Sequence, residues 1–156
     1  MMTLETILSV DPGSISAAWA LIVPDFDGGL DAAIAEEMPT ANRMVDGRAF
    51  ARILERHCPT CAVVERVNAF PKQGVASSFK FGMGYGIILG ALAAQNVRIF
   101  DVAPGSWKKH FRLNSDKEKA RALAIKRFPH VDLGRKKDAG RAEALLMGLW
   151  LRETGQ

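Results

Sequence analysis

TLETILSVDPG, residues 3–13, decides the fold class, because an apolar run rich in strand formers ends there in a lone carboxylate. Pro12 and Gly13 stop the predicted strand immediately after Asp11. A second run, CAVVE at residues 61–65, is short and continuously apolar, which is typical of a buried parallel strand, and it ends in Glu65. If these strands are parallel neighbours, both acids project from one edge of the sheet, where open α/β sheets place their sites.

The rest of the chain alternates between strand and helix patterns. Residues 3–11, 16–24 and 30–38 are predicted to be strands joined by tight turns in an antiparallel meander. The other predicted elements are a helix at 46–57, the strand at 61–65, a glycine-rich helix at 75–95, a strand at 97–102, a short helix around Trp107, and helices at 116–128 and 138–152. We therefore predict an α/β fold in which a mixed five-stranded sheet carries helices on both faces, as a single domain over residues 1–156.

Composition excludes several classes of protein. The chain has 156 residues, of which 48% are hydrophobic and 24% charged, so it can bury a core and is not disordered. The longest apolar run, around Ile87–Ala94, is shorter than the ~20 residues that span a bilayer, and no signal-peptide pattern opens the chain. Two cysteines do not make a disulfide scaffold. We expect a cytoplasmic protein with no membrane partner.

Charge is distributed unevenly around the net value of +4. Residues 1–105 carry 8 basic and 11 acidic side chains, whereas residues 106–156 carry 13 basic and 6 acidic ones. A basic C-terminal third beside strand-end carboxylates indicates a polyanionic partner. The alternative interpretation is that much of this charge lies on a solvated helix face and binds no partner.

A third acid, Glu143, lies on the face of the last predicted helix that also carries Leu146, Met147 and Trp150. A carboxylate on a buried stripe costs several kcal/mol unless it is paired, which indicates a metal or catalytic role. Asp138 stands at the start of the same helix, where two interpretations remain open: an N-cap or a further ligand.

Asp11, Glu65, Asp138 and Glu143 are accordingly the candidate catalytic and metal-binding residues. Oxygen ligands without a His/Cys set favour Mg²⁺ or Mn²⁺ over zinc. Two such ions ~3.5–4 Å apart are a common device for phosphodiester hydrolysis.

Cations and aromatic residues next to these acids are candidates for DNA contact. The candidates are Lys72, Lys80, Lys108, Lys109, Lys117, Arg135, Lys136, Lys137 and Phe70. Cys58 and Cys61 match C-x-x-C, but the motif follows a helix and opens a strand, so Cys61 is interpreted as a small core residue.

The predicted helix at 75–95 carries Gly82, Gly86, Gly90 and Ala94 as a stripe of small residues. The stripe allows close approach of the sheet, of a partner subunit or of a nucleic-acid backbone. Because the helix is apolar around its circumference, Ile88 included, we predict that it lies at the two-fold contact of a homodimer. No nucleotide cofactor is expected, since GMGYG at 82–86 lacks the spacing of a dinucleotide fingerprint.

Taken in order, these motifs resemble those of the RuvC group of Holliday-junction resolvases in the RNase H-like superfamily. The resemblance rests on Asp11–Gly13, Val64–Val67, Ser78–Gly82, Trp107–Lys109, Asp116–Glu118 and Ala142–Leu146. The run from Lys136 to Glu143 is most similar to the phage-borne and chloroplast branch. The chain departs from the bacterial pattern at Gly140, which occupies the position of an acid, and at Asn68, which occupies that of an aromatic residue; Asp138 and Phe70 are the nearest substitutes.

The resemblance implies an RNase H-like fold and a homodimeric crossover junction endodeoxyribonuclease. It would nick four-way DNA junctions symmetrically with two Mg²⁺ or Mn²⁺ ions per site. Three alternatives remain: a broader nuclease for flaps and forks, a non-catalytic junction-binding protein, and a small ATP-binding domain with a related sheet. The intact acids count against the second alternative, and the poor phosphate loop counts against the third.

Overall fold

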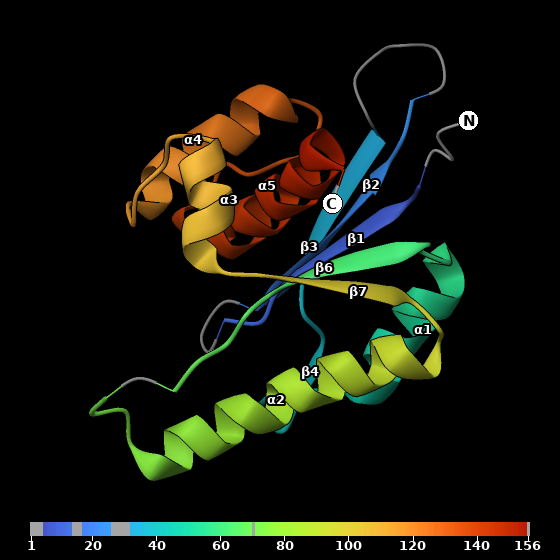
Figure 1. The fold of residues 1–156 in the computed structure, drawn as a ribbon, viewed down its shortest axis with the longest axis vertical. Helices are drawn as coiled ribbons and strands as arrows, with labels where there is room; N and C mark the ends of the chain where they lie inside the picture. The colour runs from blue at the N-terminus through green and yellow to red at the C-terminus, as the bar shows by residue number, and fades with distance from the viewer. Residues whose placement is uncertain (1–4, 14–16, 26–31, 70, 156) are drawn as a thin grey trace.

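The computed structural model describes residues 5–13, 17–25, 32–69 and 71–155. Five strands form one sheet in the order β3-β2-β1-β6-β7 (Figure 1). They are β1 (Ile7–Asp11), β2 (Ala18–Val23), β3 (Ala32–Glu37), β6 (Cys61–Glu65) and β7 (Arg98–Val102). The meander β1-β2-β3 is antiparallel, and β6 and β7 run parallel to β1, so the predicted mixed five-stranded sheet is confirmed.

Strand register brings the predicted site residues to one edge of this sheet. Asp11 pairs with Ala18, and Val10, one residue before Asp11, pairs with Val64, one residue before Glu65. Side chains alternate between the faces of a strand, so Asp11 and Glu65 point to the same face. The predicted parallel pairing of the two acid-ended strands is therefore correct.

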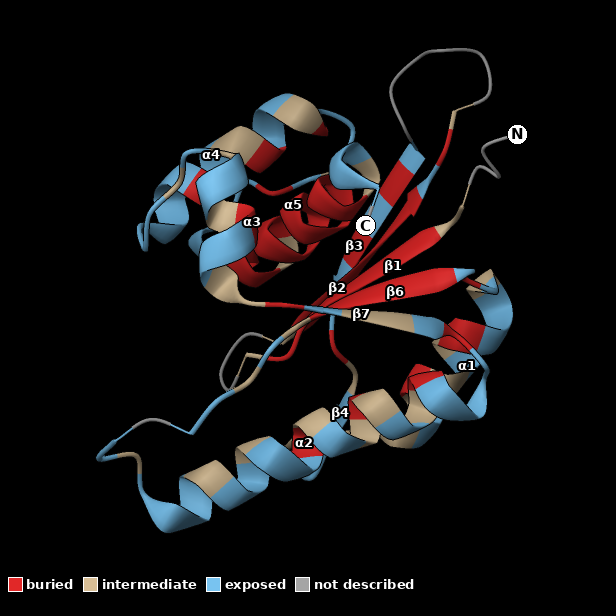
Figure 2. Cartoon of the chain, viewed as in Figure 1, coloured by how far each residue is buried: buried red, intermediate tan, exposed pale blue. Residues whose placement is uncertain are grey.

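Helices cover both faces of the sheet, as Figure 2 shows by the red buried surfaces between the layers. One face packs against α5 (Ala139–Thr154), with α3 (Pro104–His110) and α4 (Lys117–Arg127) outside it. The other face packs against α1 (Gly47–His57) and α2 (Val75–Ala94). Asp46 and Asp116 cap α1 and α4, since each side chain accepts a backbone N–H in the first turn.

Two short elements were not predicted. A hairpin of β4 (Thr40–Ala41) and β5 (Met44–Val45) precedes α1, and a 3₁₀ turn, η1 (Lys136–Asp138), precedes α5. Strands of two residues carry no detectable periodicity, so the sequence pattern missed the hairpin. Its two-residue turn places Asn42 and Arg43 in left-handed backbone, with φ of 51° and 60°, the geometry of a type I′ turn.

The small-residue stripe of α2 faces away from the sheet, so the interpretation that it packs on the sheet is wrong. A Cβ added at Gly82, Gly86 or Gly90 would meet nothing within 4 Å among the described residues. The face of α2 that packs on the sheet carries Gly84, Ile88 and Leu92. Ile88 is fully buried in its own subunit, so our placement of this residue in a subunit contact is also wrong.

By length and composition alone, α2 is the one helix of the described chain that could cross a membrane, and 17% of its apolar window is buried. This finding is weak evidence, but it corrects our expectation that no segment is long enough. Exposed Val75, Phe79 and Met83 share the helix with the glycines. The apolar surface of α2 is therefore available to another molecule.

Both edge strands of the sheet bear exposed charges. On β7, Arg98 pairs with Glu5 at 2.8 Å, and Asp101 pairs with Arg66 at 2.6 Å. On β3, Glu36 and Glu37 are exposed.

Candidate active site

Asp11 ends β1 as a buried carboxylate that is 5% exposed. The backbone N–H of Gly13 donates to its Oδ1 at 3.0 Å. Burial, together with the neighbouring carboxylates of Glu65 and Glu143, raises the pKa of Asp11 to about 8. The hydrogen bond from Gly13 thus holds this side chain at the edge of the sheet, close to two other acids.

Glu65 ends β6, and the indole of Trp107 fixes its orientation. The Trp107 Nε1–H donates to Oε2 of Glu65 at 2.8 Å, and Trp107 is the buried residue of α3. Burial raises the pKa of Glu65, while the hydrogen bond from Trp107 and the positive charges of Lys108 and Lys117 oppose that rise. The sequence showed Trp107 only as an aromatic among cations, and its role as a hydrogen-bond donor was missed.

Glu143 lies in the second turn of α5, on the face that packs against the sheet, and it is 5% exposed. The helix lies tight on β1, because the Ser9 hydroxyl donates to the carbonyl of Ala144 at 2.5 Å. A Cβ on Gly148 would come within 2.8 Å of Ile22. Glu143 is near enough to Asp11 to help raise the pKa of that carboxyl, and Lys108 Nζ lies 3.6 Å from Oε1 of Glu143.

Asp11, Glu65 and Glu143 therefore form one cluster, which we call the acid cluster; Asp11 and Glu143 are buried and Glu65 is half-buried. As the side chains stand, no three His, Cys, Asp or Glu residues in the described ranges surround one point as metal ligands. The donor chemistry nevertheless fits a hard divalent cation, because all three groups are carboxylates and their mutual repulsion raises the pKa of Asp11. A cation would remove that repulsion.

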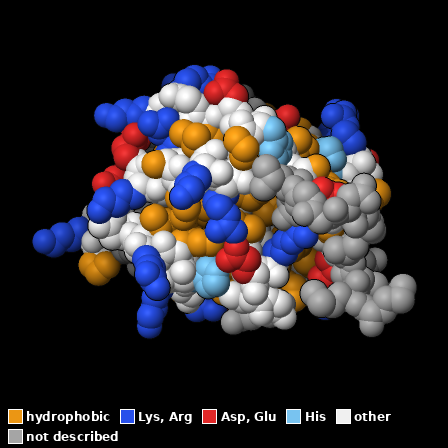
Figure 3. Space-filling model, turned by 90° about the horizontal axis from the view of Figure 1, so that it is seen from above, with side chains coloured by type: hydrophobic (Ala, Val, Ile, Leu, Met, Phe, Trp, Pro, Cys, Tyr) orange, Lys and Arg blue, Asp and Glu red, His pale blue; other side chains and the backbone are white. Residues whose placement is uncertain are grey.

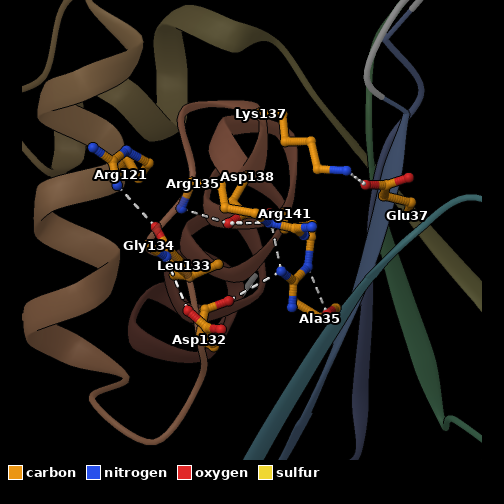
Figure 4. A network of polar contacts seen from close by, with 10 residues as sticks. All are labelled: Ala35, Glu37, Arg121, Asp132, Leu133, Gly134, Arg135, Lys137, Asp138 and Arg141. Atoms are coloured by element: carbon orange, nitrogen blue, oxygen red, sulfur yellow. Dashed lines mark hydrogen bonds and ion pairs between the residues drawn. The ribbon is translucent and has the colours of Figure 1, made fainter.

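Asp138 is buried, but its hydrogen bonds go to Arg135 and Arg141 and not to residues of the acid cluster. Arg135 donates to both of its carboxylate oxygens, through the backbone N–H and Nε to Oδ2 and through Nη2 to Oδ1, and Arg141 Nη1 lies 3.1 Å from Oδ1 (Figure 4). These hydrogen bonds lower the pKa of Asp138 to about 2. The Asp138 side chain accepts from the backbone N–H of Arg135 and so caps η1. It makes no capping hydrogen bond to α5, so the interpretation of Asp138 as the N-cap of the last helix is wrong.

Arg141, another residue that the sequence did not reveal, ties the start of α5 to the edge of the sheet. Its Nε donates to the carbonyl of Ala35 in β3 at 2.8 Å, and its Nη1 donates to the carbonyl of Asp132 at 3.0 Å. Lys137 adds an exposed ion pair with Glu37 of β3, at 3.6 Å (Figure 4). This network, centred on Asp138, anchors the turn of α5 that precedes Glu143.

The predicted DNA contacts fall into separate groups. Lys108 and Lys117 lie close enough to lower the pKa of Glu65, while Lys109 is exposed beside them on α3. Arg135, Lys136 and Lys137 are exposed at η1, toward β3. Lys72 is exposed before α2, Lys80 is exposed in the second turn of α2, and Phe70 lies outside the described residues. Figure 3, seen onto the α3–α5 side, shows Lys and Arg spread over this face rather than gathered in one patch.

A cavity of about 800 Å³ adjoins the acid cluster through Pro12 and Gly13. It lies between the start of β2 and the end of β3 on one side, and the β4–β5 hairpin and the first half of α2 on the other. We call it the hairpin groove. Its cationic lining residues are Arg43, Lys80, Lys137 and Arg141.

No family model matches the sequence, but individual proteins do. The chain is 34% identical over 110 residues to the crossover junction endodeoxyribonuclease RuvC of Nitratidesulfovibrio vulgaris, in strains DP4 and Hildenborough. The match covers 67% of this chain and 64% of those proteins, so it spans slightly less than two thirds of the length of the curated relatives.

Solved structures share the fold over nearly the whole chain. Thermus thermophilus RuvC matches with a TM-score of 0.72 at 19% identity, covering 96% of both chains. The complex of Fowlpox virus resolvase with Holliday junction DNA matches with a TM-score of 0.62 at 20% identity, covering 96% of this chain and 97% of that one. The chain therefore has the fold of Thermus thermophilus RuvC and is similar in sequence to RuvC crossover junction endodeoxyribonucleases.

Proposed function

We propose that this protein is a structure-specific endodeoxyribonuclease that resolves four-way DNA junctions by paired symmetric nicks. The single observation that carries the proposal is the acid cluster, in which three carboxylates from β1, β6 and α5 meet at one edge of the sheet. The relatives are named as crossover junction endodeoxyribonucleases, and two of the similar structures contain Holliday junction DNA. The activity, the substrate and the assembly of this chain follow as proposals.

We propose that Asp11, Glu65 and Glu143 hold two Mg²⁺ or Mn²⁺ ions, which supply Lewis-acid activation of water and charge neutralisation at the phosphate. Trp107 orients the Glu65 carboxylate, and the Gly13 N–H orients that of Asp11. Lys108 balances the charge of Glu143 and, with Lys117, offers positive charge to the phosphate backbone. Asp138 acts through the position of α5 in this mechanism.

A panel of substrates tests this function. Synthetic four-way junction, fork, flap and linear duplex are incubated with the protein in Mg²⁺, and the products are mapped on both strands of each arm. We expect symmetric nicks in the junction only. Equal cleavage of forks and flaps would favour the broader branched-DNA nuclease, and binding without cleavage would favour the junction-binding protein.

The matched variants for this assay are Asp11→Asn and Glu65→Gln, which keep side-chain shape and remove charge. Each should reduce cleavage by at least ~100-fold if it holds the ions, while junction binding persists. Full activity in EDTA, or in either variant, would contradict the proposal.

We also propose that the protein is a homodimer whose subunits meet along the outward face of α2. This face carries Phe79 at 70% exposure and Met83 at 44% exposure beside the open glycines. Small residues let two helix backbones approach closely, and flanking apolar side chains then gain burial. A two-fold dimer supplies the two matched sites that symmetric nicking of a junction needs.

A further inference from the structure

We propose that the hairpin groove binds an unpaired DNA strand beside the scissile phosphate, and that Arg43 contacts a phosphate of that strand. This inference rests on the proposed nuclease function and specifies how its site receives DNA. It assigns a binding role to the β4–β5 hairpin, for which the sequence offered no signal.

Location is the first argument. The lining of the groove includes Pro12 and Gly13, the two residues that follow Asp11, and Arg141, two residues before Glu143, so the groove lies next to the acid cluster in the fold. A cavity of about 800 Å³ is of the size that accommodates small organic ligands, ~300–1,000 Å³. A volume of this size admits the sugar and base of a nucleotide from one strand.

The lining of the groove matches a single strand in chemistry. Met38, Met44 and Phe81 supply apolar and aromatic surface for a sugar or base, and the four cations surround that surface. Proteins that hold unpaired strands combine these two features, a basic groove and aromatic side chains. Among the described lining residues Glu37 is the one carboxylate, and Lys137 pairs with it.

Two of the four cations in the lining, Arg43 and Lys80, make no ion pair with a described carboxylate. Lys137 and Arg141 pair with Glu37 and Asp138, whereas Arg43 and Lys80 take part in none of the ion pairs among the described residues. Arg43 projects from the hairpin and Lys80 from α2, and both are exposed. A phosphate between these elements would meet positive charge that no internal carboxylate neutralises.

The backbone conformation of Arg43 is a further argument. Type I′ turns strongly favour glycine at this position, yet the chain places arginine there at φ 60°. Strained residues of this kind persist where the surrounding structure enforces them, often at functional sites. Here the hairpin is held by the Asp46 N–H to Pro39 carbonyl bond at 2.8 Å, and Val45 lies 3.4 Å from the Cβ position of Gly84. The Arg43 side chain therefore extends from a hairpin whose backbone is held in place by these contacts.

Binding of a four-way junction by the inactive Glu65→Gln protein, measured by fluorescence anisotropy across a salt series, tests the assignment. Adding Arg43→Gly should weaken binding several-fold and reduce the salt slope by about one charge. Its melting temperature should stay equal or rise, because glycine relieves the turn. Arg43→Lys should restore most of the affinity. The matched control is Arg56→Ala, which removes an exposed charge from the far end of α1.

A methylphosphonate scan locates the contact. Single neutral linkages are placed at each phosphate flanking the cleavage point, and one position should weaken binding by the wild-type hairpin but not by Arg43→Gly. The proposal is overturned if Arg43→Gly binds like Arg56→Ala, if Arg43→Lys binds as poorly as Arg43→Gly, or if both hairpins give the same scan. Failure of the nuclease function is a separate result, since it appears as absence of cleavage by the wild-type protein.

Discussion

Each carboxylate of the acid cluster is held by a different kind of partner. A backbone N–H orients Asp11, an indole N–H orients Glu65, and Lys108 faces Glu143. Partners of this kind fix the direction of a ligand and its charge before any ion binds. The chemistry at this scale therefore depends on residues that are not themselves acids.

Trp107→Phe isolates one such partner. We expect cleavage to fall ~10–100-fold, as for other groups that orient metal ligands, with the largest loss at low Mg²⁺. The control is Trp19→Phe, because Trp19 is equally buried but its Nε1 has no partner among the described residues. Single-turnover rates against Mg²⁺ concentration check the prediction, and equal losses in the two variants would contradict it.

Asp11 opposes folding in the absence of metal. Because its folded pKa is raised from 3.8 to about 8, the folded state binds more protons, and stability is lost as the pH rises through this interval. In EDTA at pH 9, Asp11→Asn should melt at least ~2–4 °C above the wild type, equivalent to about 1 kcal/mol. The difference in melting temperature between Asp11→Asn and the wild type should become smaller at pH 5 and when Mg²⁺ is added, and calorimetry measures it.

The control for this comparison is Glu55→Gln, which alters an exposed carboxylate on α1. Its melting temperature should follow the wild type across the same pH range. An Asp11→Asn protein that is less stable than the wild type at pH 9 in EDTA would show that the acid cluster is not repulsive.

At the scale of elements, the position of α5 decides where Glu143 lies. The helix is anchored by Ser9 under its middle and by the Asp138 network at its start. Asp138→Asn should lower the free energy of unfolding at pH 7 by about 3 kcal/mol, as for a buried ion pair that loses one charge. Activity per folded molecule should change little.

The pH dependence of this effect has a definite sign. The folded pKa of Asp138 is lowered from 3.8 to about 2, so its contribution is present above pH 4 and is lost as the pH falls toward 2. Urea unfolding at pH 7 and pH 2.5 should show the difference between wild type and Asp138→Asn shrinking in acid. Loss of cleavage with unchanged stability would instead make Asp138 a metal ligand.

Local patterns predicted most of these elements, because each is long enough to show a period or ends at a proline, a glycine or a cap. Asp11, Glu65 and Glu143 were found because lone acids interrupt apolar segments. Trp107 and Arg141 act through contacts with residues 42 and 106 positions away in the sequence, and no local pattern encodes such contacts. The sequence left three possible neighbours open for the small-residue stripe of α2, because the circumference of this helix is almost uniformly apolar and does not mark the face that meets the sheet.

At the scale of the whole molecule, we predict a particle of twice the 17.0 kDa chain mass. Phe79→Asp with Met83→Asp should give monomers in light scattering and weaken junction cleavage, because the exposed face of α2 becomes charged. Ile125→Asp alters an apolar residue that is 40% exposed on α4 and should leave the dimer intact. A wild-type mass of one chain at all concentrations, or flotation with lipid vesicles, would contradict this use of α2.

The charged outer strands limit how copies of the chain can combine. Open sheet edges invite the addition of further strands, and charged side chains are a common defence against it. Here β3 presents Glu36 and Glu37, and β7 presents Arg98 and Asp101. In the proposed homodimer, charged side chains on both outer strands would favour a closed pair of subunits over an open-ended filament of added strands.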